Sequence, residues 1–198
     1  TVQFARKYRE RRSARPILIA PAEVTGAVSV YSAHITAYGS VPATMHRAPD
    51  DPSAGKAPAA RAALHVLLMP AEELAHMNTT EALGVNYVLA APEAMQANVE
   101  AVTFARPLAY VSKRGAVALD AGPVLLPQTG GEATGYPEAG QREMVERVMA
   151  HVGATGSVEA FVTRMIEDAR ARADVTARLA ETALRWDLDR DEIVADGT

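Results

Sequence analysis

The chain contains no cysteine and no long apolar run, and only 5% of its residues are aromatic. Without cysteine it can form neither a disulfide nor a thiol nucleophile, although this absence does not fix its compartment. The lack of a stretch of about 18 consecutive apolar residues argues against a membrane-spanning helix. The formal net charge of -4 and the scarcity of aromatic residues argue against general affinity for nucleic acid. We therefore expect a cytoplasmic protein that binds neither a membrane nor a nucleic acid.

What the chain does contain is enough apolar material for a core. Of its 198 residues, 48% are hydrophobic, which is sufficient for one domain with a smaller appendage. Alanine is abundant and arginine outnumbers lysine, a composition typical of GC-rich bacterial coding. The chain begins at Thr1 rather than at a methionine, so we expect that an upstream segment has been removed.

Short apolar segments bounded by glycine and proline predict a series of β-strands. A basic helix is expected over Thr1–Arg15, and a loop without apolar periodicity is expected over Asp50–Ala60. The predicted strands are Ile17–Ala20, Ala27–Ile35, Val41–Met45, Ala63–Met69, Tyr87–Ala90, Val102–Phe104, Leu108–Ser112 and Ala116–Leu119.

Apolar residues spaced three and four apart predict two helices in the C-terminal part of the chain. The first covers Gln141–Val152, and the second begins after the capping residue Ser157 and continues for about seven turns. Their apolar faces could pair with each other or form the contact of a homodimer. Residues 187–198 are predicted to form an acidic, frayed tail. We divide the chain into a domain over residues 1–126 and a helical extension over residues 141–198.

The segment from Pro70 to Tyr87 carries the first candidate for chemistry. Pro70 can open a helix, and Leu74, Met77 and Glu81 then follow at spacings that place them on one stripe. Glu81 would lie near the C-terminal end of this helix, on the face toward the core. Partial desolvation and the negative end of the helix dipole would both favour a neutral carboxyl, as proton transfer requires. The alternative is that the helix ends one turn earlier and Glu81 is a solvated loop residue.

No familiar catalytic or metal-binding motif accompanies Glu81. The five histidines include no HExxH pattern and no close pair, and cysteine is absent, so we expect neither a metal nor a cofactor. His34 stands out among them, because it lies where a predicted strand becomes polar, shortly before a glycine turn. A structural role and a role in a site both stay open for this histidine.

Four segments occur in an order that resembles the γ-glutamylcyclotransferase-like superfamily. They are PAEVTGAVSVY, AALHVLLMP, AEELAHMNTTEALGVNY and ARPLAYVS, and they lie within roughly residues 16–112. The resemblance aligns Glu81 with the family's catalytic glutamate and Tyr87 with the tyrosine that follows it.

The chain departs from the family pattern at two places. The family's N-terminal YGSN strand, whose backbone amides hold the γ-glutamyl group, does not open this chain. Tyr38, Gly39 and Ser40 spell YGS, but only after the second strand of the pattern, a place that favours a coincidental match, with a substitute for the missing strand as the alternative. Glu81 is followed by Ala82, where the family has glycine. The resemblance therefore implies a divergent member.

The resemblance implies an α+β fold with a small mixed β-barrel, helices outside it, a C-terminal helical extension and a cavity at one end. It also implies an acyltransferase- or lyase-type reaction without a cofactor, in which a γ-glutamyl amine compound cyclises and releases 5-oxoproline. Glu81 would carry a proton from the attacking amine to the leaving amine. The residues expected to line the cavity are Tyr31, Ser32, His34, Tyr38, Gly39, Ser40 and Tyr87.

A second class of function stays open beside the enzymatic one. The same barrel could bind a small metabolite without catalysis, while the long C-terminal helix contacts a partner protein. A Glu81 carboxylate inside a pocket would favour the enzyme, whereas an exposed or salt-bridged carboxylate would favour the binding protein.

Overall fold

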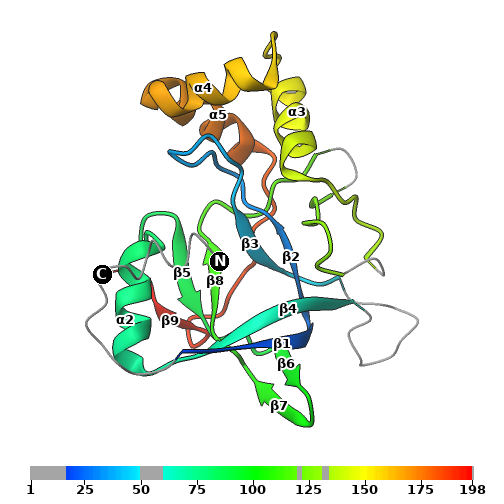
Figure 1. Ribbon diagram of the computed structural model, residues 1–198, viewed down its shortest axis with the longest axis vertical. Coiled ribbons are helices and arrows are strands. Elements are labelled where there is room, and N and C mark those ends of the chain that lie inside the picture. Colours follow the sequence, from blue (N-terminus) through cyan, green and yellow to red (C-terminus); the bar gives the residue numbers. More distant parts are fainter. Residues whose placement is uncertain (1–16, 50–59, 120–121, 131–133, 198) are drawn as a thin grey trace.

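The computed structural model describes residues 17–49, 60–119, 122–130 and 134–197. The basic helix expected over Thr1–Arg15 lies outside the described residues, as does the loop expected before Ala60. The described part of the chain has a mixed α+β fold with four helices and antiparallel sheets. Three helices gather at one end of the molecule and the sheets at the other (Figure 1).

The strands form three antiparallel sheets. A four-stranded sheet has the order β4-β1-β6-β7, a two-stranded sheet pairs β2 with β3, and a three-stranded sheet has the order β8-β5-β9. No closed barrel is found among the described residues. The strands are β1 (Leu18–Thr25), β2 (Ala27–Tyr31), β3 (Ala43–Arg47), β4 (Arg61–Leu68), β5 (Tyr87–Ala90), β6 (Gln96–Val99), β7 (Val102–Ala105), β8 (Ala109–Ser112) and β9 (Ile193–Ala195).

Gly26 separates β1 from β2 and lets consecutive strands enter different sheets. Its φ of 80° lies in the left-handed region, which side-chain-bearing residues rarely adopt. A Cβ atom at this position would lie 1.8 Å from the carbonyl oxygen of Ala94. The bend therefore depends on a residue without a side chain, and it directs β2 toward the helical end of the molecule (Figure 1).

The helices differ from the sequence prediction at the C-terminal end. They are α2 (Ala71–Thr80), α3 (Gln141–His151), α4 (Val158–Glu167) and α5 (Ala169–Glu181). The single long helix predicted after Ser157 is wrong, because Asp168 leaves the helical conformation with φ of -112° and ψ of 96°. Its carboxylate accepts hydrogen bonds from the backbone N–H groups of Arg170 and Ala171, and so caps the start of α5.

The acidic tail predicted to fray is ordered over most of its length. Its segment Ile193–Ala195 forms β9, which pairs with β5. The carboxylate of Glu192 accepts hydrogen bonds from the backbone N–H groups of Glu93 and Asp189, at 2.6 and 2.8 Å. These bonds hold the tail against the three-stranded sheet.

The largest buried cluster joins the segment around β2 to the three C-terminal helices. Tyr31, Ile35 and Val41 belong to it, together with Met144 of α3 and Leu179 of α5. One continuous apolar core therefore extends across the predicted division between residues 1–126 and 141–198. This packing fixes the position of α5 relative to the chain that follows β2, and a cavity lies between them.

Candidate functional site

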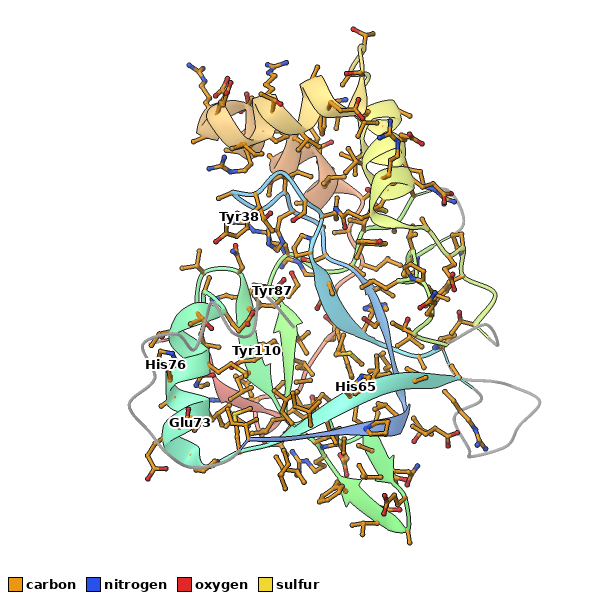
Figure 2. The ribbon with its side chains drawn as sticks, in the orientation of Figure 1. Tyr38, His65, Glu73, His76, Tyr87 and Tyr110 are labelled. Atoms are coloured by element: carbon orange, nitrogen blue, oxygen red, sulfur yellow. The ribbon has the colours of Figure 1, made fainter. Side chains whose placement is uncertain are left out.

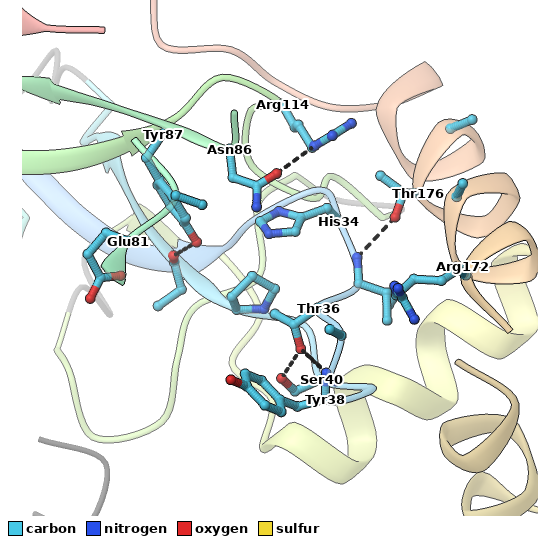
Figure 3. A pocket seen from close by; sticks show the side chains of 18 of the residues that line it. His34, Thr36, Tyr38, Ser40, Glu81, Asn86, Tyr87, Arg114, Arg172 and Thr176 are labelled. Atoms are coloured by element: carbon cyan, nitrogen blue, oxygen red, sulfur yellow. Dashed lines mark hydrogen bonds between the residues drawn. The ribbon is translucent and has the colours of Figure 1, made fainter. Parts of the chain in front are cut away.

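A cavity of about 950 Å³ lies between the C-terminal end of α2, the segment that follows β2, and α5 (Figure 3). Its walls come from parts of the chain that are far apart in sequence, so only the folded molecule assembles it. The polar residues that line it are His34, Thr36, Tyr38, Ser40, Glu81, Asn86, Tyr87, Arg114, Arg172 and Thr176.

Glu81 lies on the wall of this cavity, at the end of α2. The helix ends at Thr80, and Glu81 is its C-cap residue, with its backbone N–H donating to the carbonyl oxygen of Met77. The helix thus ends one residue before Glu81, and not a full turn before it. The Glu81 side chain is half-buried rather than solvated. Its carboxylate is close enough to raise the pKa of Tyr87.

The prediction of which side of α2 faces the interior is wrong in one respect. The buried residue of the helix is Glu73, which is 2% exposed, while Leu74 and Met77 of the predicted stripe are only half-buried (Figure 2). Glu72 and Glu73 both lie in the first turn, where the helix dipole favours negative charge. Their charge gave no sign that one of them turns inward.

Tyr87 forms a rigid part of the cavity wall. It is 8% exposed, and its hydroxyl donates a hydrogen bond to the carbonyl oxygen of Ala43 at 3.0 Å. Burial raises the pKa of Tyr87, and the charge of Glu81 raises it further, so the phenol stays protonated at neutral pH. The Tyr87 ring packs in a T-shaped arrangement with the rings of His34 and Tyr110, at centroid distances of 5.9 and 6.4 Å respectively. The hydroxyl proton is therefore used within the protein, and the side chain offers the cavity an aromatic surface.

His34 is held from behind by two buried serines. Its Nδ1 lies 2.8 Å from Ser32 Oγ, and Ser32 Oγ donates to Ser112 Oγ at 2.7 Å. Burial lowers the pKa of His34 to about 4, and the positive charge of Arg114 acts in the same direction. The imidazole is therefore neutral at pH 7.

Two arginines that the sequence analysis did not single out line the cavity opposite Glu81 (Figure 3). Arg114 Nε donates to Asn86 Oδ1 at 3.4 Å, and Arg172 Nη1 donates to the carbonyl oxygen of Met165 at 2.6 Å. The Nη groups of Arg114 and the Nε and Nη2 groups of Arg172 have no partner among the described residues. These free N–H groups are suited to a carboxylate, which a guanidinium binds with two parallel hydrogen bonds.

The YGS turn contributes side chains to the cavity but no available amides. Tyr38 and Ser40 line it, and Tyr38 is 74% exposed. The backbone N–H groups of Tyr38 and Ser40 donate to Thr36 Oγ1, and that of Gly39 donates to the carbonyl oxygen of Thr36. Because all three amides are satisfied inside the turn, they cannot act as the family's amide cradle. Gly39 itself packs against Val162 of α4 rather than facing the cavity.

Two of the other predicted lining residues lie behind the wall. Tyr31 is buried in the large cluster, and its hydroxyl donates to the carbonyl oxygen of Ala139 at 2.9 Å. Ser32 is fully buried beneath His34. All five residues of β2 are buried, and the apolar sequence of the strand did not indicate that the C-terminal helices cover Tyr31.

Neither a cluster of metal-ligand side chains nor a membrane-spanning helix is found among the described residues. No group of three or more histidine, aspartate or glutamate side chains comes together there as metal ligands would. None of the four helices combines the length and apolar character that a membrane crossing needs. Compared with protein-family models, with curated proteins and with solved structures, the chain matches none of them.

Proposed function

We propose that this cavity is the active site of a γ-glutamylcyclotransferase-like enzyme acting on a small zwitterionic amine compound. The observation that carries the proposal is that one cavity is lined by Glu81 on one side and by two arginines on another. A site with both signs of charge suits a substrate that carries an amine and a carboxylate.

The arginines would bind the carboxylate of the substrate. Arg114 and Arg172 both keep guanidinium N–H groups free of partners among the described residues. Holding the carboxylate there would fix one end of a flexible chain, which turns ring closure into a reaction between positioned groups. The large volume of about 950 Å³ leaves room for the amine that departs.

Glu81 would transfer the proton. The α-amine of a γ-glutamyl compound attacks its own γ-carbonyl carbon, forming the ring C–N bond and breaking the γ-amide C–N bond. Glu81 accepts the proton that the attacking nitrogen loses and returns it to the leaving nitrogen, so that no proton is gained or lost overall. The products are 5-oxoproline and a free amine.

The small mixed barrel of this family is part of the same proposal. β1 continues into β2 across Gly26, which connects the four-stranded sheet to the two-stranded one. β3 packs beside β8, where the backbone N–H of Ser112 donates to Thr44 Oγ1 at 2.9 Å, and so connects to the three-stranded sheet. This continuity between consecutive sheets supports a curved, barrel-like arrangement.

Replacement of one carboxylate tests the enzymatic proposal. The wild type is expected to release 5-oxoproline from γ-L-glutamyl-L-alanine, and Glu81→Gln is expected to lower the rate about 100- to 10,000-fold, because the amide cannot transfer the proton. Glu100→Gln is the matched control, since Glu100 is an exposed residue of the turn between β6 and β7. Release by Glu81→Gln at the rate of the wild type would refute the role of Glu81.

One observation favours the second candidate, a protein that binds such compounds without catalysis. The amides of the YGS turn are occupied by Thr36, so this turn offers no backbone donors for an oxyanion. The binding protein would bind γ-L-glutamyl-L-alanine in a calorimetric titration but release no 5-oxoproline from it. The enzyme would do both.

A further inference from the structure

The ring of His34 is buried and lines the cavity, yet only one of its two nitrogens has a partner among the described residues. The residue is 4% exposed. Among the described residues, the hydrogen bond of its side chain is the one between Nδ1 and Ser32 Oγ. Buried polar atoms almost always have a hydrogen-bond partner, and the described part of the chain supplies none to Nε2, so a ligand is suited to provide it.

The two serines behind the ring decide which nitrogen carries the proton. A serine hydroxyl has one hydrogen to donate, and that of Ser32 goes to Ser112 Oγ at 2.7 Å. Ser32 Oγ can then only accept in its contact of 2.8 Å with His34, which makes Nδ1–H the donor. Ser112 Oγ is held in turn by the backbone N–H of Arg114 at 3.1 Å.

A neutral imidazole carries one N–H. With the proton on Nδ1, the Nε2 atom has a lone pair and can only accept a hydrogen bond. The positive charge of Arg114 opposes protonation of the ring, which keeps His34 in this acceptor state. Figure 3 shows the ring among the cavity-lining side chains.

We propose that His34 selects a ligand with a hydrogen-bond donor, because its Nε2 accepts a hydrogen bond from a substrate N–H. Ser32 and Ser112 hold the imidazole in the Nδ1–H tautomer that leaves Nε2 free to accept. The ligand class is therefore a carboxylate compound with an N–H group, and a compound that offers only acceptors at this point is rejected. The inference rests on the proposed function for the choice of probe compounds. A γ-glutamyl dipeptide has two N–H groups that could serve, the α-amine and the γ-amide.

The tautomer is tested first, without any ligand. Long-range ¹H–¹⁵N spectra of the full chain, with ¹⁵N-labelled histidine, identify the His34 signals as those that disappear in His34→Gln. The inference predicts a protonated Nδ1 and an unprotonated Nε2 at pH 7, and a shift of the proton toward Nε2 in Ser32→Ala. A proton on Nε2 in the wild type would overturn the inference.

Binding of three probes in the Glu81→Gln background, where turnover is prevented, tests the acceptor role. γ-L-Glutamyl-L-alanine has both N–H groups, glutaryl-L-alanine lacks the α-amine, and γ-L-glutamyl-L-proline lacks the amide N–H. His34→Leu is expected to weaken binding of γ-L-glutamyl-L-alanine about 10- to 100-fold. His34→Gln, which keeps an acceptor, should recover part of this loss. His65→Leu is the control, since His65 is exposed on β4.

The two analogues identify the donor. The compound that lacks the recognised N–H should bind equally to proteins with histidine and with leucine at position 34. If His34→Leu leaves binding of all three compounds unchanged, or if none of them alters the Nε2 resonance, the acceptor role is refuted. Failure of the proposed function has a different signature, namely unchanged 5-oxoproline release by Glu81→Gln.

Discussion

At the scale of single residues, the cavity is defined by groups whose charge states are set by their surroundings. His34 is neutral because burial removes water from the ring and Arg114 repels a further positive charge. Burial, with the nearby carboxylate of Glu81, raises the pKa of Tyr87 further above its ordinary value near 10. A site with these states recognises its ligand by hydrogen bonding and by the charges of Glu81 and the arginines.

The ionisation of His34 should make the stability of the protein depend on pH. Its pKa is about 4 in the folded protein and about 6.5 in the unfolded chain, so the unfolded chain binds a proton first as the pH falls. The contribution to stability is complete above pH 6.5 and is lost on acidification toward pH 4. Between pH 7 and pH 5 we expect a loss of about 2 kcal/mol from this residue.

Urea unfolding at pH 7 and pH 5 measures this effect, with His34→Gln as the comparison. The variant lacks the ionisation and should lose less stability between the two pH values than the wild type. His46, whose pKa is also lowered by burial, is present in both proteins and contributes equally. An identical pH dependence in the two proteins would contradict the assignment.

Arg114 should act on binding rather than on the chemical step. Arg114→Gln removes a charge and the free Nη donors, and is expected to raise KM for γ-L-glutamyl-L-alanine about 10- to 100-fold with a smaller change in kcat. The neighbouring cation Lys113, whose ammonium donates to the carbonyl oxygen of Gly84, provides the control Lys113→Gln. Equal effects of the two substitutions on KM would rule out a specific role for Arg114.

At the scale of elements, individual strands were easier to predict than the strands with which they pair. The expected strand Tyr87–Ala90 matches β5, because its apolar residues lie between the polar Asn86 and the strand-breaking Pro92. The sequence did not predict β9, because Ile193–Ala195 lies within an acidic tail. This segment forms a strand only by pairing with β5, which is distant in the sequence. The break between α4 and α5 was missed because the apolar stripe continues through Asp168, and only the capping geometry interrupts it.

The same limit applies to the site. Glu81 and His34 were identified from local pattern, one from helical spacing and the other from the polar end of a strand. Arg172 was not, because its place in the same cavity as Glu81 and His34 depends on how α5 packs on the segment after β2. Local sequence thus predicted side chains of the cavity, whereas tertiary packing decided which of them meet.

The bend at Gly26 should be sensitive to substitution. Gly26→Ala adds a Cβ 1.8 Å from the carbonyl oxygen of Ala94 at a φ of 80°, so the backbone at one of these two positions must shift, and we expect a loss of at least about 3 kcal/mol. Gly153→Ala is the matched control, since Gly153 has a φ of 60° and open space around the added atom. Its cost should be only about 1–2 kcal/mol. Comparable losses in chemical denaturation would show that the contact with Ala94 is unimportant.

At the scale of the whole molecule, the helices and the sheets should unfold together. Leu179 of α5 is fully buried in the cluster that also contains Tyr31 of β2. Leu179→Ala is expected to destabilise the protein by about 2–5 kcal/mol. The fluorescence of Trp186 reports on unfolding of the sheets, because Trp186 packs against the buried cluster formed by β1 and its neighbours.

A single cooperative unit predicts that Leu179→Ala lowers the urea midpoint equally by far-UV circular dichroism and by Trp186 fluorescence. Ile166→Ala, at a residue of α4 that is 49% exposed, should have little effect on either. A fluorescence midpoint that stays unchanged while the dichroism midpoint falls would show two independently folding parts.

The position of a bound γ-glutamyl compound tests the central claim, that this cavity is a substrate site built around Glu81, most directly. The measurement is a crystal structure of Glu81→Gln with γ-L-glutamyl-L-alanine. We expect the compound in the cavity, with its carboxylate on Arg114 or Arg172 and its γ-carbonyl carbon beside residue 81. A compound bound elsewhere, or bound in the cavity with that carbon remote from residue 81, would contradict it.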